Sequence, residues 1–443
     1  MVARSPGGRL QSKTVMQALA MNRKEQFDQP RTVVFVESAA AMGGVQFSTL
    51  YLAQQLDRTR WIPVVVCPED GELPRACRDA GVEAHVLDHM GLRSTSVRIG
   101  STLRLPNPAA WGWNGYVIGA AARKLRRFLA QSRPALVVTK GLSAHFFGGL
   151  AARKLKIPCV WHAQDFISER SFGIYRRAFG YAARWLPEQI IVDGASIADQ
   201  LPPSLQPRIT VVHNGVDTNL FYPELDGAAV RRELGIPDDH LVVGHMGRVT
   251  PWKGQHYLIE AFAHIADRNP NVTLLLAGAP VFDNDSYQRR LLRMVARLGF
   301  KERVKFAGYR HDTARVLAAM DVFAFTSVEK DTSPLALLSA MSCGLPIVAF
   351  DIAGVRELMA DEDQFRLAPV EDVDALGRVL SEVLSDQSLR QRLGAAARQQ
   401  AMAEFNLAKY AERIEQVFRV AVQGVRLPGA APVVPKVQQS AAL

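Results

Sequence analysis

The chain has 443 residues, of which 48% are hydrophobic and 22% are charged. This length exceeds the roughly 250 to 300 residues at which one hydrophobic core stops growing, and the composition excludes disordered and fibrous classes for most of the chain, so two folded domains are expected. The formal net charge of +10 favours an anionic partner, but no nucleic-acid-binding module is recognisable and we expect no nucleic acid.

The N-terminal segment and the cysteines indicate where the protein acts. Residues 1–30 are basic and polar without an apolar run long enough for export, so we expect a disordered arm. The 4 cysteines are scattered and form no CxxC pair, which favours reduced, buried thiols. Both observations predict a cytoplasmic protein.

Short apolar runs that end in glycine or polar residues alternate with helical patterns from residue 31 onward. The first run, TVVFV, is followed by the loop ESAAAMGG and by the helix-like segment VQFSTLYLAQQL. The theme recurs in WIPVVVCPE, EAHVLDH, ALVVTKG, PCVWHAQ, EQIIVDG and ITVVHNG. Alternating strands and helices predict a doubly wound parallel sheet, so residues 31–216 are expected to form one Rossmann-like domain.

The theme restarts after a hinge near residues 216–226. LVVGHMGR, VTLLLAGAP, VKFAGY, VFAFTS and PIVAFD predict a second Rossmann-like domain over residues 217–400. We expect a helix at residues 401–424, with packing against the N-terminal domain as one option, and a disordered tail at residues 425–443, which are rich in Pro, Ala and Gln. Ligands bind beyond the carboxyl ends of parallel strands, so two such domains predict a cleft between them.

The loop GRVTPWKG, which follows the strand LVVGHM, carries two cations five residues apart, Arg248 and Lys253. A helix begins near Gln255, and the free N–H groups of a helix N-terminus already favour anions. An arginine and a lysine at that place can neutralise a diphosphate through charge-assisted hydrogen bonds. The spacing therefore predicts a diphosphate site, with a solvated basic loop as the alternative.

Several motifs in the same order resemble glycosyltransferase family 4, the retaining enzymes of GT-B architecture, from about residue 32 to residue 420. GRVTPWKG is similar to the family's diphosphate loop, and SPLALLSAMSCGLPIVAFDIAGVREL is similar to its nucleotide-ribose region. VVHNGVDTNLFYP resembles the segment that opens the second domain. The resemblance implies an α/β fold of two Rossmann-like domains facing across a cleft. It also implies a nucleotide-sugar donor and no cofactor.

The resemblance assigns the donor diphosphate to Arg248, Lys253 and Gly44. Gly43 and Gly44 are similar to the family's N-terminal glycine pair, whose backbone approaches either donor phosphate or acceptor. His162, which follows a predicted strand in VWHAQD, resembles the family's histidine beside the transferred sugar and is assigned a catalytic role. A hydrogen-bonded core histidine is the alternative for His162.

This chain departs from the family in the nucleotide-ribose region, where two glutamates usually stand with seven residues between them. The matching positions here hold Asp331, assigned to the donor sugar and to catalysis, and Ser339, assigned to the ribose; Thr332 and Ser333 are assigned to the same donor region. A serine makes one neutral hydrogen bond where a carboxylate accepts two charged ones. We therefore expect about 1 to 2 kcal/mol less donor affinity.

No metal site is expected. Asp283 and Asp285 spell a DxD sequence, but they lie between a strand and a helical run, where an aspartate favours the helix N-cap, and no partner carboxylate is apparent. Arg248 and Lys253 already supply the phosphate counter-charge.

A stretch without any Asp or Glu runs from His89 to Gln164 and must present a positive surface. Within it, Trp111, Trp113 and Tyr116 precede a group of basic residues, Arg123, Lys124, Arg126 and Arg127. Aromatic and basic residues together suit the boundary of an anionic membrane. We therefore expect a glycan or lipid-linked acceptor and peripheral contact with the inner face of the membrane. The alternative is a solvated basic face with buried tryptophans.

The resulting hypothesis is a retaining hexosyltransferase that uses a nucleoside-diphosphate sugar. Such enzymes let the acceptor hydroxyl attack the face from which the nucleotide leaves, through an oxocarbenium-like pair, and need no enzyme nucleophile. The alternatives are a noncatalytic relative that binds nucleotide sugars or polyanions, and a nonhydrolysing sugar-nucleotide epimerase, which would need acid/base carboxylates in the cleft.

Overall fold

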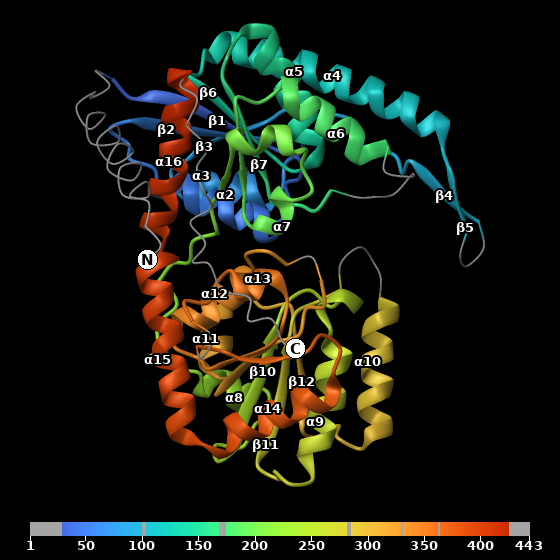
Figure 1. Ribbon diagram of the computed structural model, residues 1–443, viewed down its shortest axis with the longest axis vertical. Helices are drawn as coiled ribbons and strands as arrows, with labels where there is room; N and C mark the ends of the chain where they lie inside the picture. Colours follow the sequence, from blue (N-terminus) through green and yellow to red (C-terminus); the bar gives the residue numbers. More distant parts are fainter. Residues whose placement is uncertain are drawn as a thin grey trace, which may run out of the picture.

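The computed structural model describes residues 29–99, 103–167, 174–280, 285–329, 331–361 and 364–424. Two α/β domains lie one above the other (Figure 1). The expected arm and the expected tail lie almost entirely outside the described residues.

The N-terminal domain is built on a seven-stranded parallel sheet with the order β3-β2-β1-β6-β7-β8-β9. Its strands are short and mostly apolar because helices cover both faces. They are β1 (Arg31–Glu37), β2 (Trp61–Cys67), β3 (Glu83–Val86), β6 (Leu136–Lys140), β7 (Cys159–Ala163), β8 (Gln189–Val192) and β9 (Ile209–Val211). The sheet grows outward from β1 and β6, so its switch point lies between these two strands.

Helices cover the two faces of this sheet unequally. One face packs against α2 (Gly44–Gln55) and α3 (Glu72–Asp79), and the other against α4 (Pro108–Ser132), α5 (Leu142–Leu155) and α6 (Ile174–Trp185). Three smaller pieces complete the domain: α7 (Ala195–Ala198), the 3₁₀ turn Pro203–Arg208, and an antiparallel hairpin of β4 (Ser96–Ile99) and β5 (Leu103–Pro106), which the sequence patterns did not predict.

The C-terminal domain repeats the plan with a six-stranded parallel sheet of order β12-β11-β10-β13-β14-β15. The strands are β10 (Leu241–Met246), β11 (Val272–Ala277), β12 (Val304–Gly308), β13 (Val322–Phe325), β14 (Ile347–Phe350) and β15 (Arg366–Ala368). The helices are α8 (Ala228–Glu233), α9 (Gln255–Ala266), α10 (Asp285–Leu298), α11 (Thr313–Ala318), α12 (Leu335–Ser342), α13 (Ala353–Arg356), α14 (Val373–Ser385) and α15 (Gln387–Glu404), with a 3₁₀ turn at Pro251–Lys253. The predicted fold class, two doubly wound domains, is confirmed.

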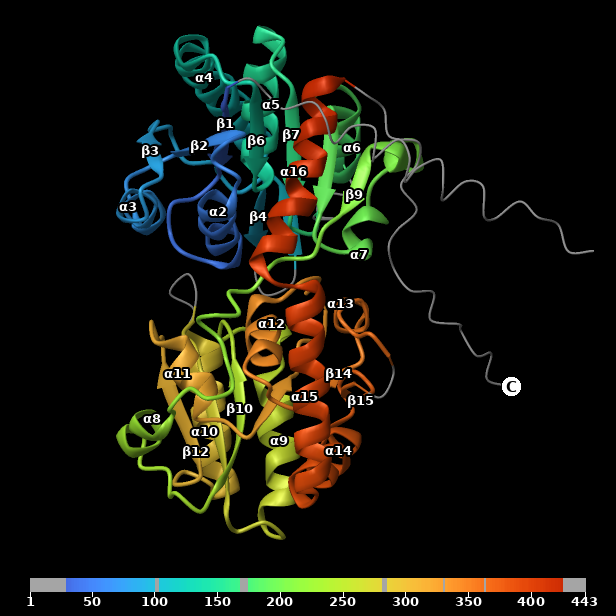
Figure 2. The same cartoon turned by 90° about the vertical axis from the view of Figure 1, so that its left-hand side faces the viewer.

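The chain crosses between the domains twice. The first crossing follows β9, and the second joins α15 to α16 (Leu407–Gln423). The two crossings run side by side, since the Val216 N–H donates to the Phe405 carbonyl at 2.7 Å. Figure 2 shows α15 against the C-terminal domain and α16 against the N-terminal domain. Phe418 of α16 packs in the same core cluster as Phe35 and Trp61, so the end of the chain completes the first domain.

The described residues contain no helix that is both long and apolar enough to cross a membrane. All four cysteines are buried and free.

Candidate functional site

The loop between β10 and α9 lies at the carboxyl edge of the second sheet. Gly254 has a φ of +70°, and a Cβ at this position would lie 2.0 Å from the Thr326 carbonyl oxygen, so only glycine fits. The Thr326 hydroxyl donates to the Lys253 carbonyl at 3.0 Å. The loop is thereby fixed against the end of β13.

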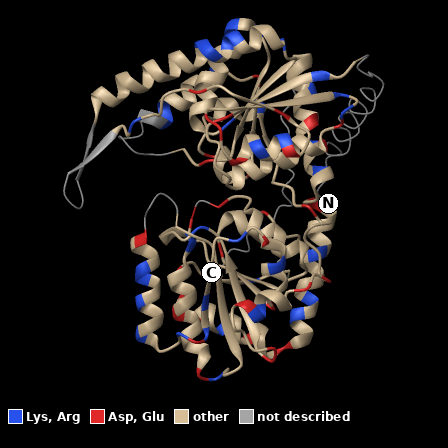
Figure 3. Ribbon diagram, turned by 180° about the vertical axis from the view of Figure 1, so that it is seen from behind, with Lys and Arg blue, Asp and Glu red and all other residues tan. Residues whose placement is uncertain are grey.

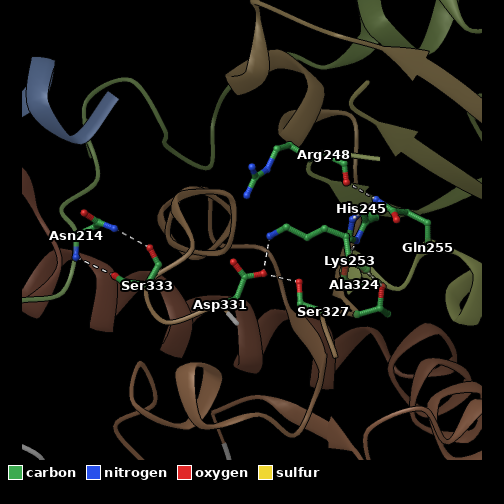
Figure 4. A network of polar contacts seen from close by, with 10 residues as sticks. Asn214, His245, Arg248, Lys253, Gln255, Ala324, Ser327, Asp331 and Ser333 are labelled. Atoms are coloured by element: carbon green, nitrogen blue, oxygen red, sulfur yellow. Dashed lines mark hydrogen bonds and ion pairs between the residues drawn. The ribbon is translucent and has the colours of Figure 1, made fainter. Parts of the chain in front are cut away.

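Lys253 and Asp331 form the centre of this edge. The Lys253 Nζ lies 2.5 Å from Asp331 Oδ2, which also accepts a hydrogen bond from the Ser327 hydroxyl (Figure 4). Lys253 is 8% exposed, and its ammonium lies 4.5 Å from the Trp252 ring centroid. Burial lowers the pKa of Lys253, while the Asp331 charge opposes that shift. The buried ammonium group of Lys253 is thus paired with the Asp331 carboxylate at the edge of the sheet where an anionic ligand is expected.

Arg248 is exposed and brings a second cation to the same place. Its guanidinium lies 5.2 Å from the Trp252 ring centroid, and Figure 4 shows its side chain and that of Lys253 extending to the same side of the loop. Burial raises the pKa of Asp165 in the N-terminal domain, and the charge of Arg248 lowers it again. Arg248 therefore faces the first domain, and the two predicted diphosphate cations are brought together.

His245, in the strand before the loop, was missed by the sequence reasoning. It is 1% exposed, its Nδ1 lies 3.0 Å from the Ala324 carbonyl oxygen, and its Nε2 lies 3.3 Å from Gln255 Nε2. Burial, and next the Lys253 charge, lower its pKa to about 4, so the imidazole is neutral at neutral pH. Gln255 also donates to the Arg248 carbonyl at 2.8 Å. The sequence did offer a signal for this residue, since His245 is the one polar side chain in the apolar strand LVVGHM.

The predicted donor residues Thr332 and Ser333 are buried and bonded to the other domain. The Thr332 hydroxyl donates to Asp193 Oδ1 at 2.7 Å. Ser333 contacts Asn214 twice: its hydroxyl accepts from the Asn214 backbone N–H at 2.8 Å, and its carbonyl accepts from the Asn214 amide at 2.9 Å. The structure therefore uses both side chains to join the domains beside Asp331.

Glycines on both sides allow this loop to fit closely. A Cβ at Gly354 would lie 1.8 Å from the Asp331 carbonyl oxygen, and a Cβ at Gly194 would lie 2.6 Å from the Thr332 Cβ. Glu357 adds a contact by accepting a hydrogen bond from the Ala195 N–H at 2.9 Å. Glu357 thus has a structural role at the start of α7 in the opposite domain.

The remaining predicted donor residues lie at two helices. Ser339 is in the second half of α12 and is 6% exposed. Gly43 caps α2 and Gly44 is its first residue. A Cβ at Gly44 would meet no atom within 4 Å. Packing therefore does not require glycine at position 44, which leaves open space at this helix N-terminus.

Three polar residues lie side by side within the N-terminal sheet. Glu37, Lys140 and His162 are register partners at the carboxyl ends of β1, β6 and β7. Each is at most 1% exposed. Burial raises the pKa of Glu37 to about 7 and lowers that of Lys140 to about 8, and each charge opposes the other's shift. Charged groups at these positions were not expected from the sequence.

His162 lies inside this row and not on the surface of the cleft. Neither ring nitrogen has a hydrogen-bond partner among the described residues. Burial, and next the charge of Lys140, lower its pKa well below the ordinary value. The structure therefore places His162 as a neutral core residue below the edge, and its predicted contact with a sugar stays a prediction.

Hydrogen bonds connect this row to both crossings. Lys140 Nζ donates to the Ser48 hydroxyl at 3.0 Å, and that hydroxyl lies 2.8 Å from the Tyr410 hydroxyl of α16. The Gln164 amide donates to Asn214 Oδ1 at 2.9 Å. Since Asn214 also binds Ser333, polar contacts run from the first sheet to the loop that carries Asp331.

The described residues contain no group of three His, Cys, Asp or Glu side chains able to hold a metal. Asp283 of the DxD sequence lies outside the described residues, and Asp285 begins α10, exposed.

Comparison with known proteins adds to this geometry. The family profile "Glycosyltransferase Family 4" matches residues 42–220, and "Glycosyl transferases group 1" matches residues 227–400. The chain belongs to this glycosyltransferase family. The two matches cover both domains, as the sequence resemblance predicted.

Named relatives in the family differ in their acceptors. A D-inositol 3-phosphate glycosyltransferase of Corynebacterium glutamicum is 27% identical over 75% of this chain and 85% of its own length. One of Stackebrandtia nassauensis is 33% identical, but the match spans only 49% of each chain, about half of that relative. A UDP-Gal:alpha-D-GlcNAc-diphosphoundecaprenol alpha-1,3-galactosyltransferase of Escherichia coli is 27% identical over 66% of this chain and 77% of its own.

A solved structure has the same fold. Anabaena HepE, crystallised in complex with UDP and glucose, superposes with a TM-score of 0.73 at 23% identity and covers 88% of this chain and 99% of its own. The likeness identifies the GT-B architecture.

Proposed function

We propose that this glycosyltransferase moves a hexose from a nucleoside-diphosphate sugar to a glycan or lipid-linked acceptor with retention of configuration. The observation that carries the proposal is the pair of cations at one loop, Arg248 exposed toward the opposite domain and Lys253 buried against Asp331. Their charge suits a diphosphate leaving group, and the two-domain cleft suits a donor and an acceptor that must meet.

In this mechanism the protein positions the reactants and stabilises the leaving group. Arg248 and Lys253 offset the negative charge that develops on the diphosphate, and the burial of Lys253 limits the competition of water at that cation. The acceptor hydroxyl attacks the face from which the nucleotide departs, so no enzyme nucleophile is needed. Asp331 and, in the proposal, His162 lie on the sugar side. We propose that no metal is required, since the two cations supply the counter-charge.

The nucleotide is expected to bind with moderate affinity. Ser339 replaces a carboxylate at the ribose position, which removes up to two charge-assisted hydrogen bonds. The open space at Gly44 leaves room for a phosphate or an acceptor at the N-terminus of α2.

A binding screen tests this proposal. Purified protein is titrated by calorimetry with UDP, GDP, ADP and CMP and their common sugar conjugates, with and without Mg²⁺. We expect one nucleoside diphosphate to bind without Mg²⁺ and the Lys253→Ala variant to bind it at least tenfold more weakly. Absence of binding to every nucleotide would contradict the proposal and favour a noncatalytic relative.

The acceptor side supports a membrane-associated substrate. Helices α4 and α6 expose four large aromatic side chains, Trp111, Tyr116, Tyr181 and Trp185. Basic residues accompany them, and Figure 3 shows Lys and Arg along the second half of α4. Interfacial aromatic residues combined with basic ones favour an anionic membrane, at about 1 kcal/mol per basic residue. We propose that the protein works in the cytoplasm, peripherally on the inner face of the membrane.

A further inference from the structure

A groove of about 440 Å³ lies between α4 and the loop that follows β3. Its walls are formed by Asp88, His89, Met90, Val117, Ala120, Ala121 and Lys124. No motif in the sequence pointed to it, since it arises where two segments about 30 residues apart pack together.

The loop is fixed to α4 at three places, so the groove is formed before any ligand arrives. Lys124 Nζ donates to the Asp88 carbonyl at 2.9 Å. The Trp113 indole N–H donates to the Gly91 carbonyl at 3.1 Å. Asn114 makes two hydrogen bonds with the backbone of Arg93, at 2.8 and 2.9 Å. A site held in this way loses little conformational entropy on binding.

The floor of the groove is apolar and its mouth is charged. Val117, Ala120, Ala121 and Lys124 lie within two turns on one face of α4. The small alanines leave the groove open, and the mouth carries the ammonium group of Lys124 and the carboxylate of Asp88. An apolar floor with an ammonium group at its mouth matches an amphiphile whose anionic head pairs with Lys124.

His89 provides a further polar contact. Its Nε2 is buried and has no hydrogen-bond partner among the described residues, although Nδ1 lies 3.1 Å from the Met90 carbonyl oxygen. Because Nδ1 faces a carbonyl oxygen, it carries the proton in the neutral ring, and Nε2 is an acceptor whose missing hydrogen bond a ligand hydroxyl can supply. His89 also borders a small cavity at the carboxyl ends of β1 and β2 with Glu37 in its wall, so the groove lies beside this edge of the sheet.

Large apolar side chains are exposed in the two segments that form the groove. Met90 is 44% exposed and Leu92 is 45% exposed, and Tyr116 of α4 is 56% exposed. Arg93 lies above the Trp113 ring at 4.1 Å. Such side chains can contact the interface of a membrane while the groove takes one lipid from it.

We propose that this groove binds the apolar, anionic part of the acceptor, a phosphate-bearing lipid whose chain lies along Val117, Ala120 and Ala121. The lipid's negative head group pairs with Lys124 at the mouth. The assignment of this lipid as the acceptor rests on the proposed function. Binding of the amphiphile itself depends only on the groove.

Calorimetry with monomeric dodecyl phosphate tests the proposal. We expect it to bind wild-type protein at least tenfold more tightly than neutral dodecyl maltoside, and inorganic phosphate alone to give no measurable heat. Ala120→Trp, which fills the groove, is expected to weaken dodecyl phosphate binding at least tenfold, and Lys124→Glu by a similar factor. Unchanged binding by Ala120→Trp, or phosphate binding as strongly as the amphiphile, would overturn the proposal.

Matched variants separate the groove from general effects. Ala130→Trp adds the same ring at an exposed position of α4, and Arg126→Glu makes the same charge change outside the groove; both are expected to bind dodecyl phosphate within twofold of wild type. Equal weakening by Arg126→Glu and Lys124→Glu would show diffuse attraction and overturn the site.

The same proteins are titrated with the nucleoside diphosphate. A wild type that binds the amphiphile but no nucleotide contradicts the proposed function alone, and the reverse result contradicts the groove alone.

Discussion

The two domains share one architecture but place their charged residues differently. In the C-terminal domain, Arg248, Lys253 and Asp331 stand on loops beyond the strands, where a ligand can meet them. In the N-terminal domain, Glu37 and Lys140 are the last residues of the neighbouring strands β1 and β6. They are partners in the register of these strands, and both are buried. Arg248 is exposed and can meet a ligand directly, and Lys253 lies just below it beside Asp331. Glu37 and Lys140 lie deeper, inside the sheet, where they organise the structure around them.

The strand charges give the largest expected effect. Lys140→Met leaves Glu37 buried without its cation, and breaking a buried pair in this way costs about 3 to 5 kcal/mol of unfolding free energy. Because burial raises the Glu37 pKa to about 7, the loss should be larger at pH 8 than at pH 6, where Glu37 takes up a proton. Urea unfolding at both pH values measures this.

The double variant Glu37→Gln with Lys140→Met controls that prediction. Removing both charges should restore part of the stability, because no unpaired charge remains. Losses that simply add would show that the two residues do not act as a pair.

The loop charges should affect turnover more than folding, although Lys253→Ala also leaves Asp331 without its buried partner and should cost some stability. Lys253→Ala is expected to lower kcat about 100- to 1,000-fold, the usual effect of removing one group that stabilises transition-state charge. Steady-state kinetics with the donor found in the screen measures it, and Lys301→Ala, an exposed lysine of the same domain, is the control. A kcat within threefold of wild type would contradict the assigned role.

Asp193 links the two domains, since it lies in the N-terminal domain and accepts a hydrogen bond from the Thr332 hydroxyl of the C-terminal domain. Burial raises its pKa to about 7 from an ordinary value of 3.8. A raised pKa contributes stability that is complete below pH 3.8 and is lost as the pH rises through 7. Asp193→Asn should therefore reduce the fall in unfolding free energy between pH 4 and pH 7, by about 3 kcal/mol. Unfolding curves at several pH values test this, and an unchanged slope would contradict it.

Ser339 gives the smallest expected effect. Ser339→Glu restores the carboxylate usual in the family and should tighten nucleoside diphosphate binding about five- to tenfold through charge-assisted bonds to the ribose. Calorimetry measures the change in affinity. Ser342→Glu cannot serve as the control, because the Ser342 hydroxyl is buried and donates a hydrogen bond to the Phe221 carbonyl. Weaker binding by Ser339→Glu would show that position 339 does not face the ribose.

The sequence by itself determined the fold class and the loop that carries the two cations. Strands and helices alternate visibly, and GRVTPWKG carries its cations within one short loop. These features are local: strand and helix periodicity repeat within a few residues, and the end of a parallel strand fixes where a loop must lie. Arg248 and Lys253 could therefore be placed at one edge before the structure was known, whereas Asp331 was assigned there only by the resemblance to the family.

Tertiary structure alone decided what lies between distant segments. Glu37, Lys140 and His162 meet only because β1, β6 and β7 are neighbours, and no spacing along the chain reports strand register. The same holds for Thr332, whose hydroxyl crosses to Asp193, and for the groove beside α4. These contacts depend on how whole elements pack, which is set by the shape of the core and not by any local pattern.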